Sequence, residues 1–263
     1  MSAPARHPDA VGRRTSDRPR AAWHAATVVE VRRETTTAVR LVLDAPTWPG
    51  NDPGAHLDVR LTAPDGYQAT RSYSIASSRF SAPAEHHVVL AVDEVPDGEV
   101  SPFLTHELRA GDRLEVHGPL GAFFVWQPGV DDRPVQLVAG GSGVVPLFAM
   151  AAARAATADP APFRLLYSVR TPADLLFADE LAALAGPALD VDVVWTRAAP
   201  AGSSEPVGRL TRDGLAARTR PAADRPHVFV CGPTGFVETV ASWLQELGHQ
   251  AADIRTERFG GTP

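Results

Sequence analysis

"RSYSIASS", residues 71–78, places an arginine, a tyrosine and several serines in a stretch whose residue types otherwise favour a β-strand. Two interpretations fit this octapeptide equally well. It is either an antiparallel strand with one solvated face, or a strand whose polar side chains hold a ligand. The choice between them depends on the rest of the sequence.

Length and composition limit the kind of protein to which this stretch belongs. A chain of 263 residues with 44% hydrophobic content is expected to form two domains. The net charge of -6 argues against nucleic acid as a partner, because binding to a phosphate backbone needs a basic surface. No apolar run is long enough to cross a membrane, and none follows the arginine pair at 13 and 14. We therefore expect a cytoplasmic protein without a membrane span.

Two residue types exclude further chemistry. Cys231 is the single cysteine, so the chain can form no internal disulfide and cannot supply four cysteine ligands to an iron–sulfur cluster. The sequence contains no lysine, which excludes a lysine Schiff base and a P-loop. No metal site is expected.

The first half of the chain has the pattern of a small β-domain. Residues 1–22 are rich in Pro, Ala, Arg and Asp and have no hydrophobic period, so a disordered arm is expected. Residues 23–130 contain six β-prone runs separated by Gly and Pro turns, which predicts an antiparallel β-barrel. The segment SPFLTHEL predicts a short helix with Ser101 as its N-cap. The six runs are ATVVEVRRE, AVRLVL, HLDVRL, YQATRSYSI, HHVVLAV and DRLEVHG.

The second half, residues 131–263, alternates β-prone and helical segments. This alternation predicts an α/β domain with a parallel sheet, and the boundary is expected between Gln127 and Arg133. The expected strands are VQLVAGG, FRLLYSV, LDVDVVW and HVFVCG, and the expected helices are VVPLFAMAAARAA, ADLLFADELAAL and GFVETVASWLQELG.

Two loops at the ends of these strands are candidate ligand sites. AGGSGVVP brings glycines to the start of a helix, where backbone N–H groups can receive a pyrophosphate, although Pro146 stands where G-x-G-x-x-G has its third glycine. VFVCGPTGF ends the last predicted strand, so Cys231 is expected at the same edge of the sheet. Each feature alone also has a simpler explanation. The first loop can be an ordinary turn, and Cys231 can be an ordinary buried residue.

Taken together and in this order, RSYSIASS, VAGGSGVVP and VFVCGPTGF closely resemble the motifs of the ferredoxin-NADP reductase superfamily. The resemblance extends from about residue 25 to residue 259. It implies a two-domain fold, with an N-terminal antiparallel flavin-binding β-barrel followed by an α/β parallel-sheet NAD(P)-binding domain whose C-terminal tail lies over the flavin. The chain resembles the form without a fused iron–sulfur domain.

By this resemblance the RSYS strand holds a flavin. Arg71 has the planar donor fork that suits a phosphate, Tyr73 offers an aromatic face for the isoalloxazine, and Ser74 can hydrogen-bond near flavin N5. The segment GEVS, residues 98–101, resembles a second flavin-phosphate segment. The flavin-binding residues implied are Arg71, Ser72, Tyr73, Ser74, Gly98, Val100 and Ser101.

One departure from the family bears on the identity of the flavin. Many relatives have a basic residue just before the GEVS turn, whereas this chain has Asp93 and Glu94. Two carboxylates would repel a diphosphate if they pointed at it. FAD is favoured, and FMN stays open.

The resemblance also implies a nicotinamide nucleotide on the α/β domain. Thr196 and Arg197 resemble the Ser-Arg pair of relatives that use NADPH, and Ser168 and Arg170 follow the adjacent strand, so NADPH is favoured over NADH. The alternative is that these arginines are ordinary surface residues, which are common in a chain that has no lysine. The nucleotide-binding residues implied are Gly141, Ser142, Gly143, Ser168, Arg170, Thr196, Arg197, Cys231, Gly232 and Pro233.

The C-terminal TERFGG resembles the terminal carboxylate and aromatic residue of the family. By resemblance Glu257 lies near Cys231 and stabilises or relays charge, and Phe259 covers the flavin face that the nicotinamide must reach. The catalytic residues implied are Ser74, Cys231, Glu257 and Phe259.

The function implied is that of a flavoprotein reductase. It would move a hydride from NAD(P)H to the flavin and then single electrons to a separate protein, such as a ferredoxin or an oxygenase or cytochrome component. Two alternatives stay open. One is a flavin or quinone reductase (diaphorase), and the other is an electron-entry or regulatory subunit without turnover of its own.

Overall fold

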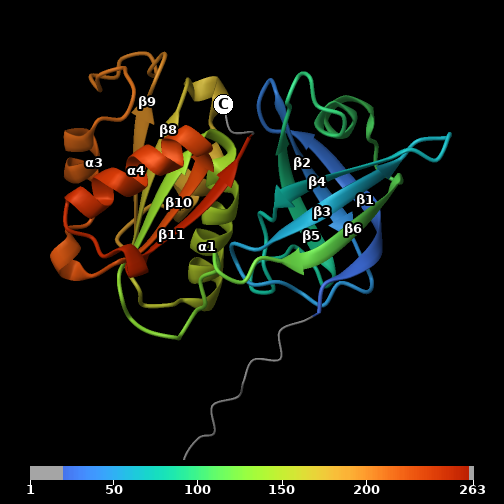
Figure 1. Cartoon of the computed structure of the whole chain (residues 1–263), viewed down its shortest axis with the longest axis horizontal. Coiled ribbons are helices and arrows are strands. Elements are labelled where there is room, and N and C mark those ends of the chain that lie inside the picture. Colours follow the sequence, from blue (N-terminus) through green and yellow to red (C-terminus); the bar gives the residue numbers. More distant parts are fainter. Residues whose placement is uncertain (1–19, 261–263) are drawn as a thin grey trace, which may run out of the picture.

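The first domain is an antiparallel sheet that curls into a barrel. The computed structural model describes residues 20–260, and in this part of the chain the first sheet has six strands in the order β4-β3-β6-β1-β2-β5 (Figure 1). Ile75, which follows β4, forms an antiparallel bridge with Leu90 of β5, so the two edge strands of the sheet meet. The strands are β1 (Ala22–Arg33), β2 (Ala38–Asp44), β3 (His56–Thr62), β4 (Gln68–Ser74), β5 (His87–Asp93) and β6 (Arg113–Leu120).

Alternating apolar residues fill the inside of the barrel. Leu41 and Leu43 of β2 and Leu57 and Val59 of β3 are fully buried in one cluster, which is the period of two expected of strands with one face toward a core. The short π-helix η1 (Phe103–Glu107) packs against β2 and β5.

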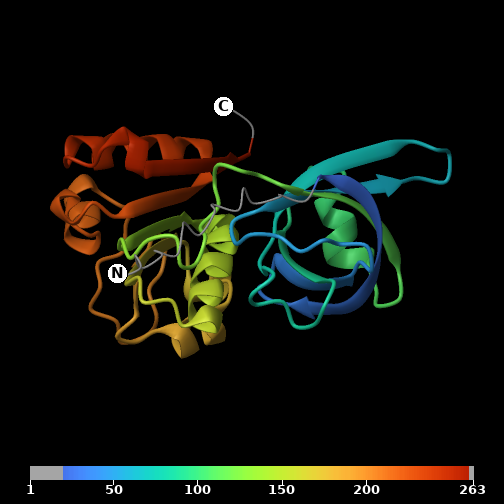
Figure 2. The ribbon, with the colours of Figure 1, turned by 90° about the horizontal axis from the view of Figure 1, so that it is seen from below.

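The second domain is a parallel sheet with helices on both faces. Within the described residues its five strands lie in the order β11-β10-β7-β8-β9, with α1 on one side of the sheet and α4 on the other (Figure 2). The strands are β7 (Val135–Gly140), β8 (Phe163–Val169), β9 (Leu189–Trp195), β10 (His227–Pro233) and β11 (Ile254–Phe259). The α-helices are α1 (Val144–Thr157), α2 (Ala178–Leu184), α3 (Arg212–Arg218) and α4 (Thr234–Glu246), and the 3₁₀ helices are η2 (Gly141–Gly143), η3 (Pro172–Asp174), η4 (Ala222–Asp224) and η5 (Ala251–Asp253).

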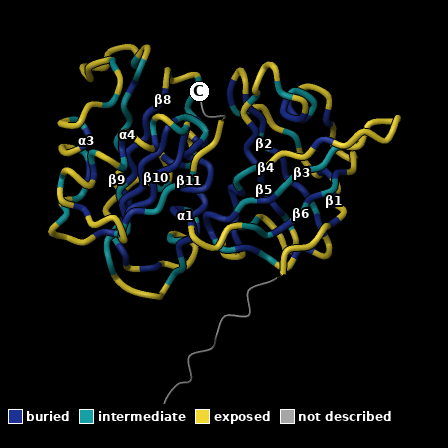
Figure 3. Tube along the Cα trace, in the orientation of Figure 1, coloured by how far each residue is buried: buried dark blue, intermediate teal, exposed yellow. Residues whose placement is uncertain are grey.

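Two apolar clusters explain this layering. Leu137 of β7 belongs to the cluster that includes α1, and its neighbour Val138 belongs to the cluster that includes α4. The strand is therefore apolar on both faces, as parallel sheets between two helical layers are. Figure 3 shows buried residues along the strands and exposed residues in the outer loops and at the tip of the β3–β4 hairpin.

The structure confirms the predicted fold class and ten of the strands. The predicted runs coincide with β1 to β10, but β11 lies in the segment predicted as a C-terminal tail, and α3 was not predicted. The predicted helix over ADLLFADELAAL is shorter than expected. Phe177 has a φ of 57°, outside the helical region, so α2 begins only at Ala178.

The prediction that Ser101 caps the short helix is wrong. Pro102 takes the N-cap position, and no side chain caps this helix. Ser101 instead accepts a hydrogen bond through Oγ from the backbone N–H of Val95 at 3.0 Å. A tight turn, in which Gly98 N donates to Val95 O at 2.8 Å, brings Val95 to the hydroxyl, so Ser101 stabilises the loop rather than the helix.

The predicted limits of the domains remain a proposal. Residues 1–19 of the predicted arm lie outside the described residues, and β1 begins at Ala22. Residues 121–134 connect the two sheets and include the predicted boundary between Gln127 and Arg133. Among the described helices, none is long and apolar enough to cross a membrane.

The two domains share a buried interface. Arg40 of β2 lies 2.7 Å from Glu34 and 2.6 Å from Glu180 of α2, and its guanidinium lies 4.9 Å from the ring centre of Phe177. Barrel residues such as Ala38 also belong to the same apolar cluster as α1. The interface therefore fixes the end of β4 and β5 relative to the edge of the parallel sheet.

Candidate active site between the two domains

A cavity of about 380 Å³ lies beside β4, and we refer to it as the barrel cavity. The barrel contributes β4, the end of β5 and the loop that leads to η1, and the second domain contributes the start of α1 and the end of β11. All the residues predicted to bind a flavin line it. The lining residues are Arg71, Ser72, Tyr73, Ser74, Ala91, Asp93, Glu94, Val95, Gly98, Glu99, Val100, Ser101, Ser142, Val145, Phe259 and Gly260.

Arg71 is held at one end of the barrel cavity by an acidic neighbour. Its Nη2 donates to Glu99 Oε2 at 2.6 Å, and its Nη1 donates to the backbone oxygen of Thr70. Tyr67 donates its hydroxyl to the other oxygen of Glu99 at 2.9 Å. About half of each side chain of the Arg71–Glu99 pair is exposed, so the guanidinium can exchange this partner for an anionic ligand.

Tyr73 supplies an apolar ring to the same cavity. Burial raises the pKa of its phenol to about 12, although the nearby Arg71 opposes the rise. The phenol is therefore neutral at physiological pH, and the ring is available for stacking against an aromatic ligand.

Ser74 connects β4 to the second domain. Its hydroxyl donates to Glu257 Oε1 of β11 at 3.1 Å. His56 lies opposite Ser74 in the β3–β4 pair and places Nδ1 3.8 Å from Glu257 Oε2. Burial raises the pKa of Glu257 to about 7, while the hydrogen bond from Ser74 acts in the opposite direction. This carboxyl can thus take up or release a proton near neutral pH.

Cys231 lies behind these groups rather than in a cavity. It is fully buried on β10 and pairs with Glu257 in the register of β10 and β11. Burial, with the charge of Glu257 as the second cause, raises the pKa of its thiol well above the ordinary value. The thiol is therefore protonated and poorly nucleophilic.

A second cavity of about 490 Å³, the sheet cavity, lies at the carboxyl ends of β7, β8 and β9. This is the edge at which parallel α/β sheets bind their ligands. The lining residues are Thr35, Thr37, Ala38, Asp93, Glu94, Pro96, Gly140, Gly141, Ser142, Ser168, Val169, Arg170, Asp174, Leu176, Thr196, Pro233, Phe236 and Phe259.

The glycines after β7 serve two different purposes. Gly141 has a φ of +55°, and a Cβ built on it would meet no atom within 4 Å, so its bare backbone is open to the sheet cavity. A Cβ on Gly143 would lie 2.2 Å from the carbonyl oxygen of Cys231. Gly143 therefore lets the loop pack against β10, and Gly141 leaves room for a ligand.

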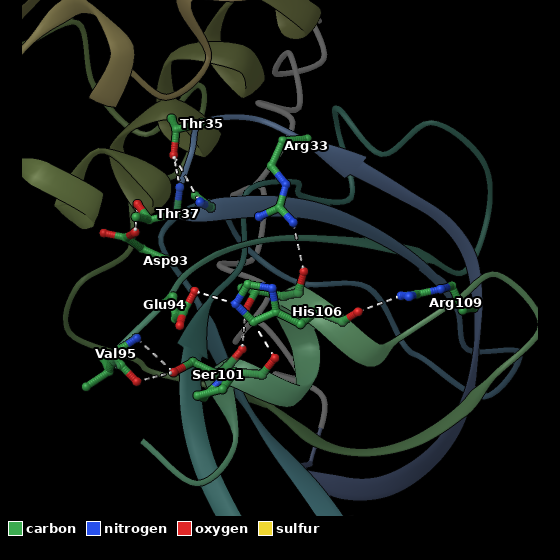
Figure 4. Close-up of polar contacts among 12 residues, drawn as sticks. Arg33, Thr35, Thr37, Asp93, Glu94, Val95, Ser101, His106 and Arg109 are labelled. Atoms are coloured by element: carbon green, nitrogen blue, oxygen red, sulfur yellow. Dashed lines mark hydrogen bonds and ion pairs between the residues drawn. The ribbon is translucent and has the colours of Figure 1, made fainter. Parts of the chain in front are cut away.

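The two cavities share Asp93, Glu94, Ser142 and Phe259 and therefore adjoin. Partners hold both carboxylates, as Figure 4 shows. Thr37 donates its hydroxyl to Asp93 Oδ1 at 2.8 Å, and His106 Nε2 lies 2.7 Å from Glu94 Oε2.

The structure brings most of the predicted site residues to the two cavities. Of the predicted nucleotide-binding residues, six line the sheet cavity: Gly141, Ser142, Ser168, Arg170, Thr196 and Pro233. Five predicted residues of the described chain line neither cavity: Gly143, Arg197, Cys231, Gly232 and Glu257.

Some residues of the site were not predicted. Glu99 lies inside the GEVS segment and could have been noted as a competitor for Arg71. Thr35 and Thr37 in ETTTA gave no sequence signal, because only the fold brings this turn beside β5. His56 lies in a run for which the sequence predicts only a strand, and its proximity to Glu257 arises from the domain interface.

Comparisons with family models agree with this geometry. Residues 28–125 match the oxidoreductase FAD-binding domain, and residues 137–242 match the oxidoreductase NAD-binding domain. Fold and site thus define a two-domain oxidoreductase with one FAD-binding and one NAD-binding domain. The two matched domains, in this order, confirm the resemblance to the ferredoxin-NADP reductase superfamily found in the sequence.

Three curated relatives illustrate the range of this family. The chain is 33% identical over 217 residues to the glycine betaine monooxygenase reductase subunit of Chromohalobacter salexigens, covering 80% of this chain and 56% of that protein. It is 31% identical to a flavohemoprotein of Rhodopirellula baltica, covering 79% and 52%. It is 28% identical to the toluate 1,2-dioxygenase electron transfer component of Pseudomonas putida, covering 80% and 59%. The chain thus spans between about half and three fifths of these relatives.

Solved structures show the same two-domain arrangement. The FAD/NAD-binding domain of the nitric oxide dioxygenase from Vibrio cholerae has a TM-score of 0.78 and 25% identity, and the match covers 90% of this chain and 99% of that one. A cytochrome P450 reductase from Amycolatopsis has a TM-score of 0.77 and 27% identity, and the match covers 91% of this chain and 70% of that one.

The residues present fit the two cofactors that these families imply. In the barrel cavity the ring of Tyr73 and the guanidinium of Arg71 suit the isoalloxazine and the phosphate of a flavin. In the sheet cavity the open backbone at Gly141 suits a pyrophosphate. FAD and a pyridine nucleotide are thus the expected ligands.

Proposed function

We propose that the chain is an NAD(P)H-dependent flavin oxidoreductase that passes electrons to a separate acceptor protein. When bound, the flavin can accept a hydride and release electrons singly, a chemistry that belongs to the cofactor. The observation that supports this proposal most directly is that the barrel cavity and the sheet cavity adjoin at Ser142 and Phe259. Adjoining cavities allow the two cofactors to come into contact.

The residues of this chain have distinct parts in the proposal. Tyr73 stacks against the flavin, Arg71 binds its phosphate, and Phe259, 37% exposed at the junction, gates access of the nicotinamide. Ser74 lines the barrel cavity, and its hydrogen bond to Glu257 of β11 places a carboxyl that can exchange a proton directly behind the flavin-binding strand. Cys231 shapes the site from behind through packing, since its thiol is buried.

We propose FAD as the flavin and NADPH as the favoured nucleotide. Arg170, with Ser168 and Thr196, lines the sheet cavity, whereas Arg197 does not. A 2′-phosphate would therefore be bound by Arg170, whose planar fork suits a phosphate monoester. Arg170→Ala is expected to lower the preference for NADPH over NADH, measured as the ratio of kcat/KM values, and Arg197→Ala serves as the matched control. An equal change in both variants would contradict this assignment.

The acceptor we propose is a ferredoxin or an oxygenase or cytochrome component. The support is that relatives of this chain include the reductase subunit of a monooxygenase and the electron transfer component of a dioxygenase. The cytoplasmic location remains a prediction from the sequence.

The proposed function is tested by anaerobic addition of NADPH or NADH to the FAD-loaded protein, followed by an acceptor. We expect the flavin absorbance to bleach and an oxidised ferredoxin to be reduced. Bleaching with electron transfer only to free flavin or quinone would instead support a diaphorase. An FAD-loaded protein that bleaches with neither nucleotide and reduces no one-electron dye would contradict the enzyme and support an electron-entry or regulatory subunit.

A further inference from the structure

The junction of the two cavities carries a charge that does not suit its proposed ligands. Asp93 and Glu94 line both cavities, and each proposed ligand is an anionic dinucleotide. Two free carboxylates at this place would repel the diphosphates, since like charges a few ångströms apart destabilise each other in a partly desolvated site. The repulsion depends on where the two carboxylates point.

Glu94 points toward a histidine from the short helix η1. His106 Nε2 lies 2.7 Å from Glu94 Oε2, and the side chain of Glu94 is 21% exposed while that of His106 is 53% exposed. The pair therefore has its carboxylate on the side of the cavities and its imidazole on the side of solvent. An imidazole nitrogen that donates to a carboxylate oxygen holds that oxygen in place through the hydrogen bond.

The position of His106 is fixed by two arginines outside the cavity. Arg109 donates through Nη1 to the backbone oxygen of His106 at 2.9 Å, and Arg33 of β1 donates to the backbone oxygen of Thr105 at 3.1 Å (Figure 4). These carbonyls are at the end of η1 and have no partner within a regular helix. The arginines thus hold the last turn of η1, from which His106 reaches Glu94.

Asp93 has a second, independent partner in the turn between β1 and β2. Thr37 donates its hydroxyl to Asp93 Oδ1 at 2.8 Å. The turn is fixed because Thr35 Oγ1 accepts from the backbone N–H groups of Thr37 and Ala38, at 3.2 and 3.0 Å, and because Glu94 N donates to Thr37 O at 3.0 Å. Both carboxylates are therefore bound to the barrel at once.

We propose that His106 and Thr37 are positioning residues that hold the Glu94 and Asp93 carboxylates against the barrel, so that an anionic dinucleotide can enter beside them. The inference rests on the proposed function, because it concerns the same two cavities. It assigns a role to His106, which lines neither cavity, and to Thr37, which lines the sheet cavity. Sequence changes at either residue would change dinucleotide binding through the carboxylate that it holds.

A double-mutant cycle on dinucleotide binding tests this inference. The probes are FAD with flavin-free protein and NADP⁺ with FAD-loaded protein, measured as dissociation constants at two salt concentrations. His106→Ala is expected to weaken binding of at least one probe by about tenfold at low salt, and less at high salt, because the released Glu94 carboxylate is screened. Glu94→Gln in the His106→Ala background is expected to restore binding.

Further variants separate positioning from a general loss of structure. His106→Arg keeps an N–H donor for Glu94 and is expected to bind like the wild type. Thr37→Val is expected to weaken binding, with rescue by Asp93→Asn. His227→Ala is the control, because His227 forms a histidine–carboxylate pair with Asp131 at 2.9 Å and neither residue lines the two cavities.

The outcomes distinguish this inference from the proposed function. Wild-type protein that binds neither FAD nor NADP⁺ would contradict the proposed function and this inference together. Wild-type binding with no change in His106→Ala, or a loss that Glu94→Gln does not rescue, would overturn the positioning role and leave the proposed function standing.

Discussion

At the scale of single residues, the surroundings of Glu257 determine the pKa of its carboxyl. Its carboxyl is mostly covered at the domain interface, with the hydroxyl of Ser74 on one oxygen and the imidazole of His56 near the other. Desolvation favours the neutral acid, which is why its pKa rises from an ordinary value of 4.5 to about 7. A carboxyl of this kind can exchange a proton at the pH at which the protein is expected to work.

This pKa has a consequence for stability. The folded chain binds the Glu257 proton more tightly than the unfolded chain, so the free energy of unfolding falls as pH rises from about 4.5 through about 7. Glu257→Gln removes this titration. Between pH 4.5 and 7.5 the wild type is expected to lose about 3 kcal/mol more than the variant in urea unfolding.

Glu85→Gln is the control for this prediction, because the Glu85 side chain is 89% exposed. It is expected to follow the wild type over the whole pH range. Parallel pH curves for the wild type and Glu257→Gln would show that burial does not raise the pKa of Glu257 in solution.

At the scale of elements, the loop between β7 and α1 decides whether the sheet cavity exists. Gly143 brings η2 against the backbone of Cys231 on β10, which leaves Gly141 facing the cavity. Pro146 stands where the dinucleotide motif has its third glycine. Pro146 lies in the first turn of α1, where its missing N–H costs no helical hydrogen bond.

Gly143→Ala is expected to push this loop away from β10. The added Cβ would lie 2.2 Å from the carbonyl oxygen of Cys231, so the chain must shift at a cost of about 2 kcal/mol in unfolding free energy. Binding of NADP⁺, measured by difference absorbance, is expected to weaken by about tenfold or more. The control is Gly235→Ala in α4, where the added Cβ meets nothing within 4 Å. Equal NADP⁺ affinities for the two variants would contradict this function of the loop.

The sequence predicted elements well where one local rule decides the structure. Alternating apolar residues predicted β1 to β6, and strand–helix alternation predicted β7 to β10. Prediction from the sequence failed where a contact between residues far apart in the chain decides the structure. TERFGG read as a tail because nothing local shows that Ile254–Phe259 pairs with β10, and Ser101 read as a helix cap because the turn at Val95 takes its hydroxyl.

The same distinction applies to the candidate site. Residues in contiguous motifs, such as Arg71 and Tyr73, line the barrel cavity as expected, although their roles remain proposals. Thr37 and His106 come from separate elements, and only the folded barrel brings them to Asp93 and Glu94.

At the scale of the whole molecule, the interface between the domains keeps the two cavities together. Arg40 lies between Glu34 and Glu180, and its side chain is only 15% exposed. A buried charge is tolerated in a folded protein only when it has a partner of opposite charge. Removing one partner of such a pair therefore lowers the free energy of unfolding. The two domains are thus held in the arrangement that brings β11 to β4.

Arg40→Ala is expected to destabilise the protein by about 2 to 3 kcal/mol in urea unfolding, because it removes the ion pair with Glu180 across the interface and leaves the buried carboxylate of Glu34 with less compensation. Arg212→Ala is the matched control, since Arg212 is 44% exposed and pairs with Glu246 on the surface. The control is expected to change stability by less than about 1 kcal/mol. Equal effects of the two substitutions would contradict the structural importance of the interface.

The central claim is that the barrel cavity on the RSYS strand binds the flavin. The most direct test is an equilibrium titration of flavin-free protein with FAD, followed by flavin absorbance and fluorescence. We expect saturation at one FAD per chain, and dissociation constants raised about tenfold or more by Arg71→Ala and by Tyr73→Ala. Arg60→Ala, on the neighbouring strand β3 and outside the cavity, is expected to bind like the wild type. Wild-type protein that binds no FAD, or variants at Arg71 and Tyr73 that bind it unchanged, would contradict the account.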